Sequence, residues 1–105
     1  MITAMNNRRS EPRFFADQLV TVTALDAAFE QSGAGTIVDY SASGIGMQVE
    51  FSLSAGCRVK IQWPRGQVLG EVRYCHAKAR GSFRVGVKIT EVVALGAINE
   101  QSGAA

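Results

Sequence analysis

The sequence predicts an all-β domain, a six-stranded antiparallel β-barrel, from three observations. Apolar and polar residues alternate with a period of two in several short runs, which places successive side chains on opposite faces of a strand. Clusters of Gly, Ser and Pro separate these runs and are typical of turns. Each strand then has one apolar face to bury, and an antiparallel meander that closes on itself buries all of them.

Six segments are expected to form the strands. In chain order they are residues 18–25, 36–40, 45–51, 57–63, 67–76 and 83–89. The alternation is clearest in the third, fourth and sixth segments. In the long fifth segment Val68, Val72 and Tyr74 share one face, so Tyr74 is expected in the core. Turns are expected at residues 32–35, 54–56, 64–66 and 80–82.

The two ends of the chain are expected to differ from the barrel. Residues 91–101 lose the alternation, and the spacing of Val92, Leu95 and Ile98 predicts a short C-terminal helix, although Gly96 weakens it. Residues 1–7 and 102–105 are expected to be disordered segments on either side of a domain that covers residues 8–101.

The composition excludes several classes of protein. A length of 105 residues fits one domain, and 47% hydrophobic with 19% charged residues is ordinary for a soluble fold. No run approaches the roughly 20 apolar residues of a membrane helix, and the start lacks a secretory leader, so we expect a cytoplasmic protein with no membrane partner. A formal net charge of +2 is too small to attract long polyanions, so neither DNA nor RNA is expected as a partner. We expect a monomer or a weak dimer.

Catalytic and metal sites are not predicted. Cys57 and Cys75 fall in strand-like runs with no second Cys or His at metal-ligand spacing, which predicts core thiols. His76, the one histidine, has no acid or nucleophile beside it in the sequence. We therefore expect a binding protein that is not an enzyme and has no cofactor.

Three arginines gather near the start of the chain. Arg8, Arg9 and Arg13 lie within six residues, and Pro12 keeps their segment extended because it cannot continue a helix. A guanidinium offers a planar fork of donors to phosphate oxygens, pairs with guanine O6 and N7, and stacks on a base. The cluster suits a ligand that contains both phosphodiester and guanine, although by itself it is also typical of a solvated charge cluster.

A second polar cluster occupies the turn between the second and third expected strands. In the run Asp39-Tyr40-Ser41-Ala42-Ser43-Gly44, Asp39 can accept hydrogen bonds from guanine N1 and N2, and Ser41 can donate one to phosphate. Gly44 permits a positive φ and a close approach of the backbone. The composition alone is equally typical of a plain turn that links two strands.

Taken together, the two clusters match a known signature. The pair Arg9-x-x-x-Arg13, followed after a strand by Asp39-x-Ser41-x-x-Gly44, resembles both motifs of the PilZ domain family at all five positions. The likeness extends over about residues 8–93 and includes the residue sequences of the strands that follow the motifs. The chain thus resembles a stand-alone PilZ domain, a bacterial receptor for the second messenger cyclic di-GMP.

The resemblance implies a barrel whose N-terminal arginine loop folds over cyclic di-GMP. Residues that match Arg9 and Arg13 contact the phosphates and guanines, and residues that match Asp39, Ser41 and Gly44 form the opposing surface. Arg8 adds a third guanidinium, which leads us to expect two stacked ligand molecules per chain. Arg73, on the polar face of the long fifth strand, is expected to be an accessory contact.

The expected function is that of a receptor module. Ligand-induced change of the arginine loop and barrel surface would relay the messenger level to an unidentified effector protein. The alternative is a nucleotide-independent PilZ-like protein-protein adaptor, against which the intact motifs count. A barrel that binds single-stranded nucleic acid is disfavoured, because four of the eight aromatic residues fall on faces expected to be buried, which leaves few exposed rings for base stacking. These aromatics are Phe51, Trp63, Tyr74 and Phe83.

Overall fold

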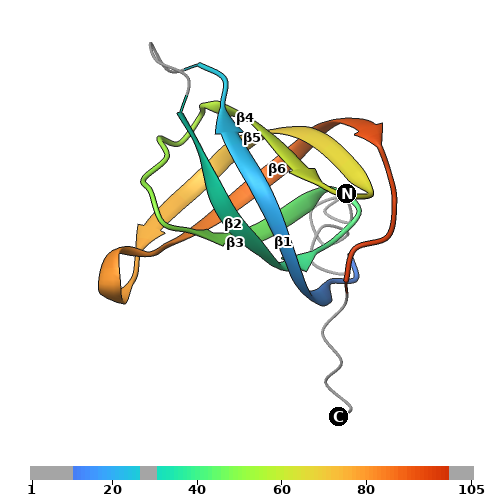
Figure 1. Ribbon diagram of the computed structural model, residues 1–105, viewed down its shortest axis with the longest axis horizontal. Helices are drawn as coiled ribbons and strands as arrows, with labels where there is room; N and C mark the ends of the chain where they lie inside the picture. Colours follow the sequence, from blue (N-terminus) through green and yellow to red (C-terminus); the bar gives the residue numbers. More distant parts are fainter. Residues whose placement is uncertain (1–10, 27–30, 100–105) are drawn as a thin grey trace, which may run out of the picture.

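Six strands form a closed barrel in the computed structural model of the chain, which describes residues 11–26 and 31–99 (Figure 1). The strands are β1 (Phe14–Ala24), β2 (Gln31–Tyr40), β3 (Gly44–Val49), β4 (Arg58–Trp63), β5 (Gly66–Ala77) and β6 (Phe83–Ala94), with a short 3-10 helix, η1 (Ala79–Gly81), before β6. All the strand pairs are antiparallel. The predicted six-stranded antiparallel barrel is confirmed.

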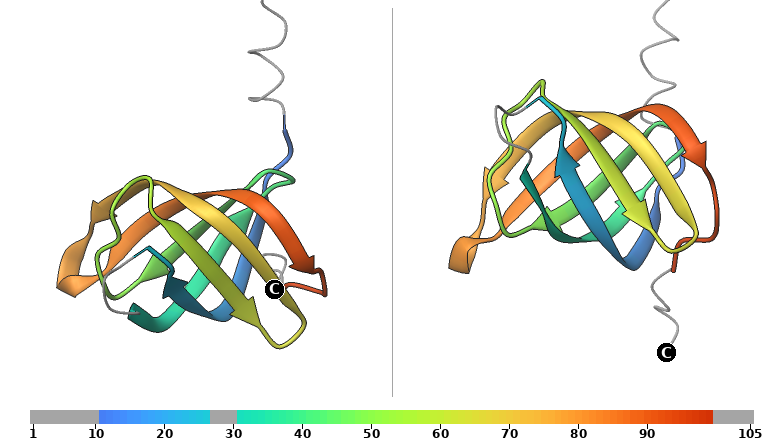
Figure 2. Two further views of the ribbon diagram at one scale, coloured as in Figure 1. Left: turned by 90° about the horizontal axis from the view of Figure 1, so that it is seen from above. Right: turned by 45° about the horizontal axis from the view of Figure 1, so that its top comes forward.

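The order of the strands around the barrel is β1-β2-β3-β6-β5-β4, so the predicted simple meander is wrong. In this order β3 and β4 lie on opposite sides of the barrel, and the loop between them crosses one end (Figure 2). Leu53, at the middle of the loop, is 4% exposed and belongs to the core. Crossing the barrel lets this loop cover an apolar opening that a tight β3–β4 hairpin would leave in water.

Strand β2 begins earlier than the sequence predicts, at Gln31, and the turn expected at residues 32–35 is wrong. Gly33 and Gly35 pair with Val22 and Val20 of β1. The two glycines are there for space, because a Cβ on Gly33 would approach the ring of Phe51 to 2.8 Å. Gly33 and Gly35, which the sequence suggested to be turn residues, are therefore strand positions where neighbouring side chains pack against the backbone.

The core follows the predicted alternation. Every strand contributes buried aliphatic side chains, and Ile37, Met47 and Ile61 are fully buried. Trp63 is 7% exposed and its indole Nε1 donates a hydrogen bond to the carbonyl oxygen of Ala97 at 3.1 Å, which confirms it as a core aromatic. Cys57 and Cys75 are half-buried free thiols that pack against this core, as expected, and burial raises the pKa of the Cys57 thiol.

Residues 91–99 do not form the predicted helix. β6 continues to Ala94, because Glu91, Val92 and Ala94 supply the pairing partners of Leu69, Val68 and Gln67 at the start of β5. Residues 95–99, which we call the strap, then lie against the end of the barrel opposite Leu53. The remaining two residues of the predicted helix and both expected disordered segments, 1–7 and 102–105, lie outside the described residues.

Hydrogen bonds fasten the strap to β1. The amide of Asp17 donates to the carbonyl oxygen of Asn99 at 2.9 Å, and the amide of Asn99 donates to Oε1 of Gln18 at 2.9 Å. Gly96 allows the strap to pass, since a Cβ there would collide with the backbone of Arg65. The start of β1, which leads back to Arg13, is therefore held at a fixed place.

Candidate functional site

A row of outward-facing residues crosses four strands of the barrel wall. Asp39 of β2 pairs with Gly46 of β3, Gly46 pairs with Gly86 of β6, and Gly86 pairs with Tyr74 of β5. The flanking positions on β3 and β6 point into the core, so this row faces outward. The two glycines leave a low floor between the carboxylate of Asp39 and the ring of Tyr74.

Asp39 is the centre of a charged cluster at one end of this floor. Its Oδ1 accepts a hydrogen bond from Nη2 of Arg13 at 2.6 Å, and its Oδ2 accepts one from Nη2 of Arg84 at 2.7 Å. The carboxylate lies directly over Gly46, where a Cβ would collide with it. Each oxygen of Asp39 thus has one guanidinium partner, and the side chain is only 16% exposed.

The turn between β2 and β3 brings the second motif to the same place. The amide of Ser41 donates to the carbonyl oxygen of Gly44 at 2.8 Å, and the buried Ser41 hydroxyl accepts a hydrogen bond from Nη1 of Arg13 at 3.2 Å. Gly44 does not have the positive φ that the sequence suggested. Space explains this glycine better, because a Cβ would lie 3.2 Å from the carbonyl oxygen of Val87.

A second contact joins residues 11–13 to this turn. The Ser43 hydroxyl donates to Oε1 of Glu11 at 2.7 Å. Hydrogen bonds from Ser43 and Ser41 lower the pKa of the Glu11 carboxyl, and the charge of Arg13 lowers it further. Residues 11–13 are therefore attached to the turn through both a carboxylate and a guanidinium, and they lie beside that turn in both views of Figure 2.

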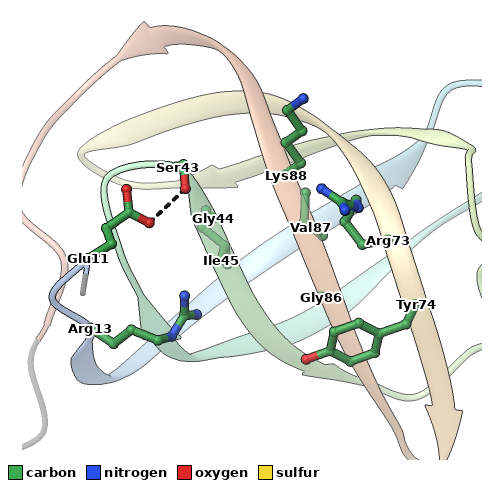
Figure 3. A pocket seen from close by; sticks show the side chains of 10 residues that line it. All are labelled: Glu11, Arg13, Ser43, Gly44, Ile45, Arg73, Tyr74, Gly86, Val87 and Lys88. Atoms are coloured by element: carbon green, nitrogen blue, oxygen red, sulfur yellow. Dashed lines mark hydrogen bonds between the residues drawn. The ribbon is translucent and has the colours of Figure 1, made fainter. Parts of the chain in front are cut away.

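A cavity of about 580 Å³ opens beside these contacts, a size that suits a small-molecule ligand. Glu11 and Arg13 stand on one side of it, and Arg73, Tyr74 and Lys88 stand on the other (Figure 3). Its floor and the remaining wall are formed by Ser43, Gly44, Ile45, Gly86 and Val87. Among the described residues, three cations and one carboxylate line the cavity, and the net positive charge suits an anionic ligand.

A family model for the PilZ domain matches residues 7–97 of the 105-residue chain. The chain belongs to the PilZ domain family. No curated protein sequence matches it. PilZ domains are binding modules rather than enzymes, and in general they are receptors for cyclic di-GMP. Within the described residues of this PilZ domain, no helix is long and apolar enough to cross a membrane.

The structure brings most of the predicted site residues of the PilZ domain together. Arg13, Asp39 and Ser41 are in direct contact, and Gly44 and Arg73 line the adjacent cavity. Arg8 and Arg9 lie outside the described residues. Sequence reasoning did not assign five polar or aromatic residues of the cluster and cavity to the site: Glu11, Ser43, Tyr74, Arg84 and Lys88.

Tyr74 was placed in the core by the sequence, and this prediction is wrong. The register of β5 against β6 shifts between Val72 and Tyr74, so Arg73 is an extra residue and Tyr74 turns outward. The ring is 40% exposed, lies over Gly86 and stacks on His76 with centroids 4.9 Å apart. Gly86 carries the signal that was overlooked, because a glycine within a strand often marks a bulge or a close contact.

The other three aromatic predictions hold. Trp63 is buried, and Phe51 and Phe83 are half-buried against the core. Tyr74 is therefore the aromatic side chain that reaches the cavity from the barrel wall.

Proposed function

We propose that this PilZ domain is a cyclic di-GMP receptor that relays the level of the messenger to an effector protein. The observation that carries the proposal is the direct contact of Arg13, from the first motif, with Asp39 and Ser41, from the second. Residues 26 and 28 positions apart in the sequence meet at the rim of a net positive cavity. Donors for phosphate and an acceptor for guanine therefore stand side by side.

The chemistry of the cavity suits a cyclic dinucleotide. Its two phosphates would lie near Arg13, Arg73 and Lys88, and guanidinium groups bind phosphate oxygens with two parallel hydrogen bonds. Asp39 would accept hydrogen bonds from the N1 and N2 groups of one guanine. The exposed face of Tyr74 offers a guanine a surface for stacking over the glycine floor.

The two arginines outside the described residues complete the proposal. Arg9 precedes Glu11, which lines the cavity, by two residues in the sequence. We assign Arg9 to the same phosphate and guanine contacts as Arg13. Arg8 would supply the extra positive charge that a second stacked ligand molecule needs.

A ligand-induced change would follow from the contacts that Arg13 and Glu11 make with the β2–β3 turn. Arg13 is already bonded to Asp39 and Ser41, and Ser43 is bonded to Glu11. A ligand that uses these groups must replace their present partners, and residues 11–13 must then move. The displaced segment and the occupied cavity together form the altered surface that an effector would recognise.

Calorimetric titration tests the proposal against a nucleotide-independent adaptor. Cyclic di-GMP should bind, whereas GTP and a short single-stranded oligonucleotide should not bind appreciably. Arg13→Ala should remove most of the affinity, since both ligand groups lose a partner. Arg65→Ala is the matched control, because Arg65 is an exposed arginine that does not line the cavity. Absence of binding by the wild-type protein would favour the adaptor instead.

A further inference from the structure

We propose that the carboxylate of Glu11 is a built-in competitor for ligand phosphate and sets the affinity of the site. The identity of the ligand rests on the function proposed above, but the competition itself rests on the position of Glu11. The side chain lines the same cavity as Arg13, Arg73 and Lys88. It therefore supplies a negative charge that these cations face.

The hydrogen bonds of Glu11 show that it is held in the anionic form. Ser43 donates to Oε1 at 2.7 Å, and this bond is the largest cause of the lowered pKa of the carboxyl. Glu11 is therefore ionised at neutral pH. A phosphate that enters the cavity meets a fixed negative charge and finds the Ser43 hydroxyl already engaged.

The geometry also joins this competition to the movement of Arg13. Glu11 and Arg13 belong to one short segment on either side of Pro12, and each is bonded to the β2–β3 turn. A single displacement of this segment therefore breaks both the Ser43–Glu11 hydrogen bond and the Arg13–Asp39 ion pair. A ligand must supply the interactions that replace both contacts, which lowers its apparent affinity.

A purely structural role for Glu11 predicts the opposite result. If the Glu11–Ser43 bond mainly holds the segment ready for the ligand, its loss should weaken binding. Glu11→Gln separates the two roles, because the amide oxygen can still accept the hydrogen bond from Ser43 while the charge is gone. Glu11→Ala removes both the charge and the hydrogen bond.

The test is titration of Glu11→Gln with cyclic di-GMP at low salt. We expect binding about five- to tenfold tighter than in the wild type, with a smaller gain when salt screens the charges. Glu50→Gln is the matched control, since it makes the same change of net charge on an exposed residue beyond the far end of β3. A gain of affinity cannot arise from misfolding. An equal gain in Glu50→Gln, or no gain in Glu11→Gln, would overturn the proposal.

Inorganic pyrophosphate serves as a second probe that does not depend on guanine recognition. Glu11→Gln should bind it more tightly than the wild type, and Glu50→Gln should not. Suppose that neither the wild type nor Glu11→Gln binds cyclic di-GMP, but Glu11→Gln binds pyrophosphate more tightly than the wild type. The receptor function is then rejected and the competition by Glu11 is supported. If cyclic di-GMP binds equally well to both proteins, the competition fails and the receptor function stands. Failure of both probes to distinguish Glu11→Gln rejects the competition.

Discussion

Arg84 is expected to control ligand affinity although it does not line the cavity. It holds Oδ2 of Asp39 at 2.7 Å while Arg13 holds Oδ1. In Arg84→Met, Arg13 becomes the one cationic partner of that carboxylate among the residues that the structure describes, and it can engage both oxygens. Arg13 is then bound more tightly within the protein, and less of it is free to contact phosphate. The orientation in which Asp39 would accept hydrogen bonds from guanine is lost as well.

The magnitude can be worked out from burial. A charge-assisted hydrogen bond contributes about 1.5–3 kcal/mol and an exposed ion pair about 0.2–1 kcal/mol. Arg84 is 34% exposed and Asp39 is 16% exposed, so solvent screening places this pair near the lower range, at about 1 kcal/mol. Nε of Arg84 is buried and has no hydrogen-bond partner among the described residues, and its removal offsets part of the loss. The melting temperature of Arg84→Met should therefore fall by no more than about 4–8 °C.

Affinity should respond more strongly than stability. We expect Arg84→Met to weaken cyclic di-GMP binding about tenfold, equivalent to about 1.4 kcal/mol, and Arg84→Lys to restore part of it. A double-mutant cycle with Asp39→Asn in calorimetric titrations isolates the effect, because loss of Arg84 should matter little once the carboxylate is gone. Wild-type affinity in Arg84→Met, or additive losses in the cycle, would refute this reasoning.

Three further changes test other contacts. Tyr74→Ala should weaken cyclic di-GMP binding about tenfold, as loss of a base-stacking surface does, with little change in the melting temperature because the ring is exposed; an unchanged dissociation constant would count against stacking. Arg8→Ala should shift the calorimetric stoichiometry from two ligands per chain toward one, and a wild-type titration that saturates at one would exclude the paired ligand. Hydrogen bonds from Arg58 lower the pKa of Asp26 below its ordinary value of 3.8, so the stability that this carboxylate contributes is present above that pH and lost as the pH falls through the lowered pKa. Urea unfolding at pH 7 and at pH 3 or below should thus show a smaller acid-induced loss in Asp26→Asn than in the wild type, and equal losses would contradict the assignment.

The positions of the strands were predictable from the sequence because every second side chain of a barrel strand points into the core. The sequence located all six strands, and its two motifs singled out Arg13, Asp39 and Ser41, which meet in the structure. It failed where long-range pairing overrides a local pattern. β6 extends to Ala94 because β5 needs a partner, and no local signal in residues 91–94 reveals that need.

The missed site residues have the same explanation. Tyr74 faces the cavity because one extra residue in β5 reverses the alternation, and only the position of β6 reveals the extra residue. Arg84 reaches Asp39 across β3 because Gly46 carries no side chain to block the path. Such contacts depend on which strands are neighbours, and the order around the barrel was not the predicted one.

The strap gives this protein an intrinsic optical probe. Trp63 is the sole tryptophan of the chain, and its indole is bonded to the carbonyl oxygen of Ala97 in the strap. The strap is in turn bonded to Asp17 and Gln18, four and five residues after Arg13. Tryptophan emission is therefore expected to report on the start of β1, which follows Arg13, rather than on the ligand itself. A spectral shift on titration would show that displacement of residues 11–13 affects the end of the barrel at Trp63. Constant tryptophan emission with quenching of tyrosine emission would confine the response to the strands that carry Tyr40 and Tyr74.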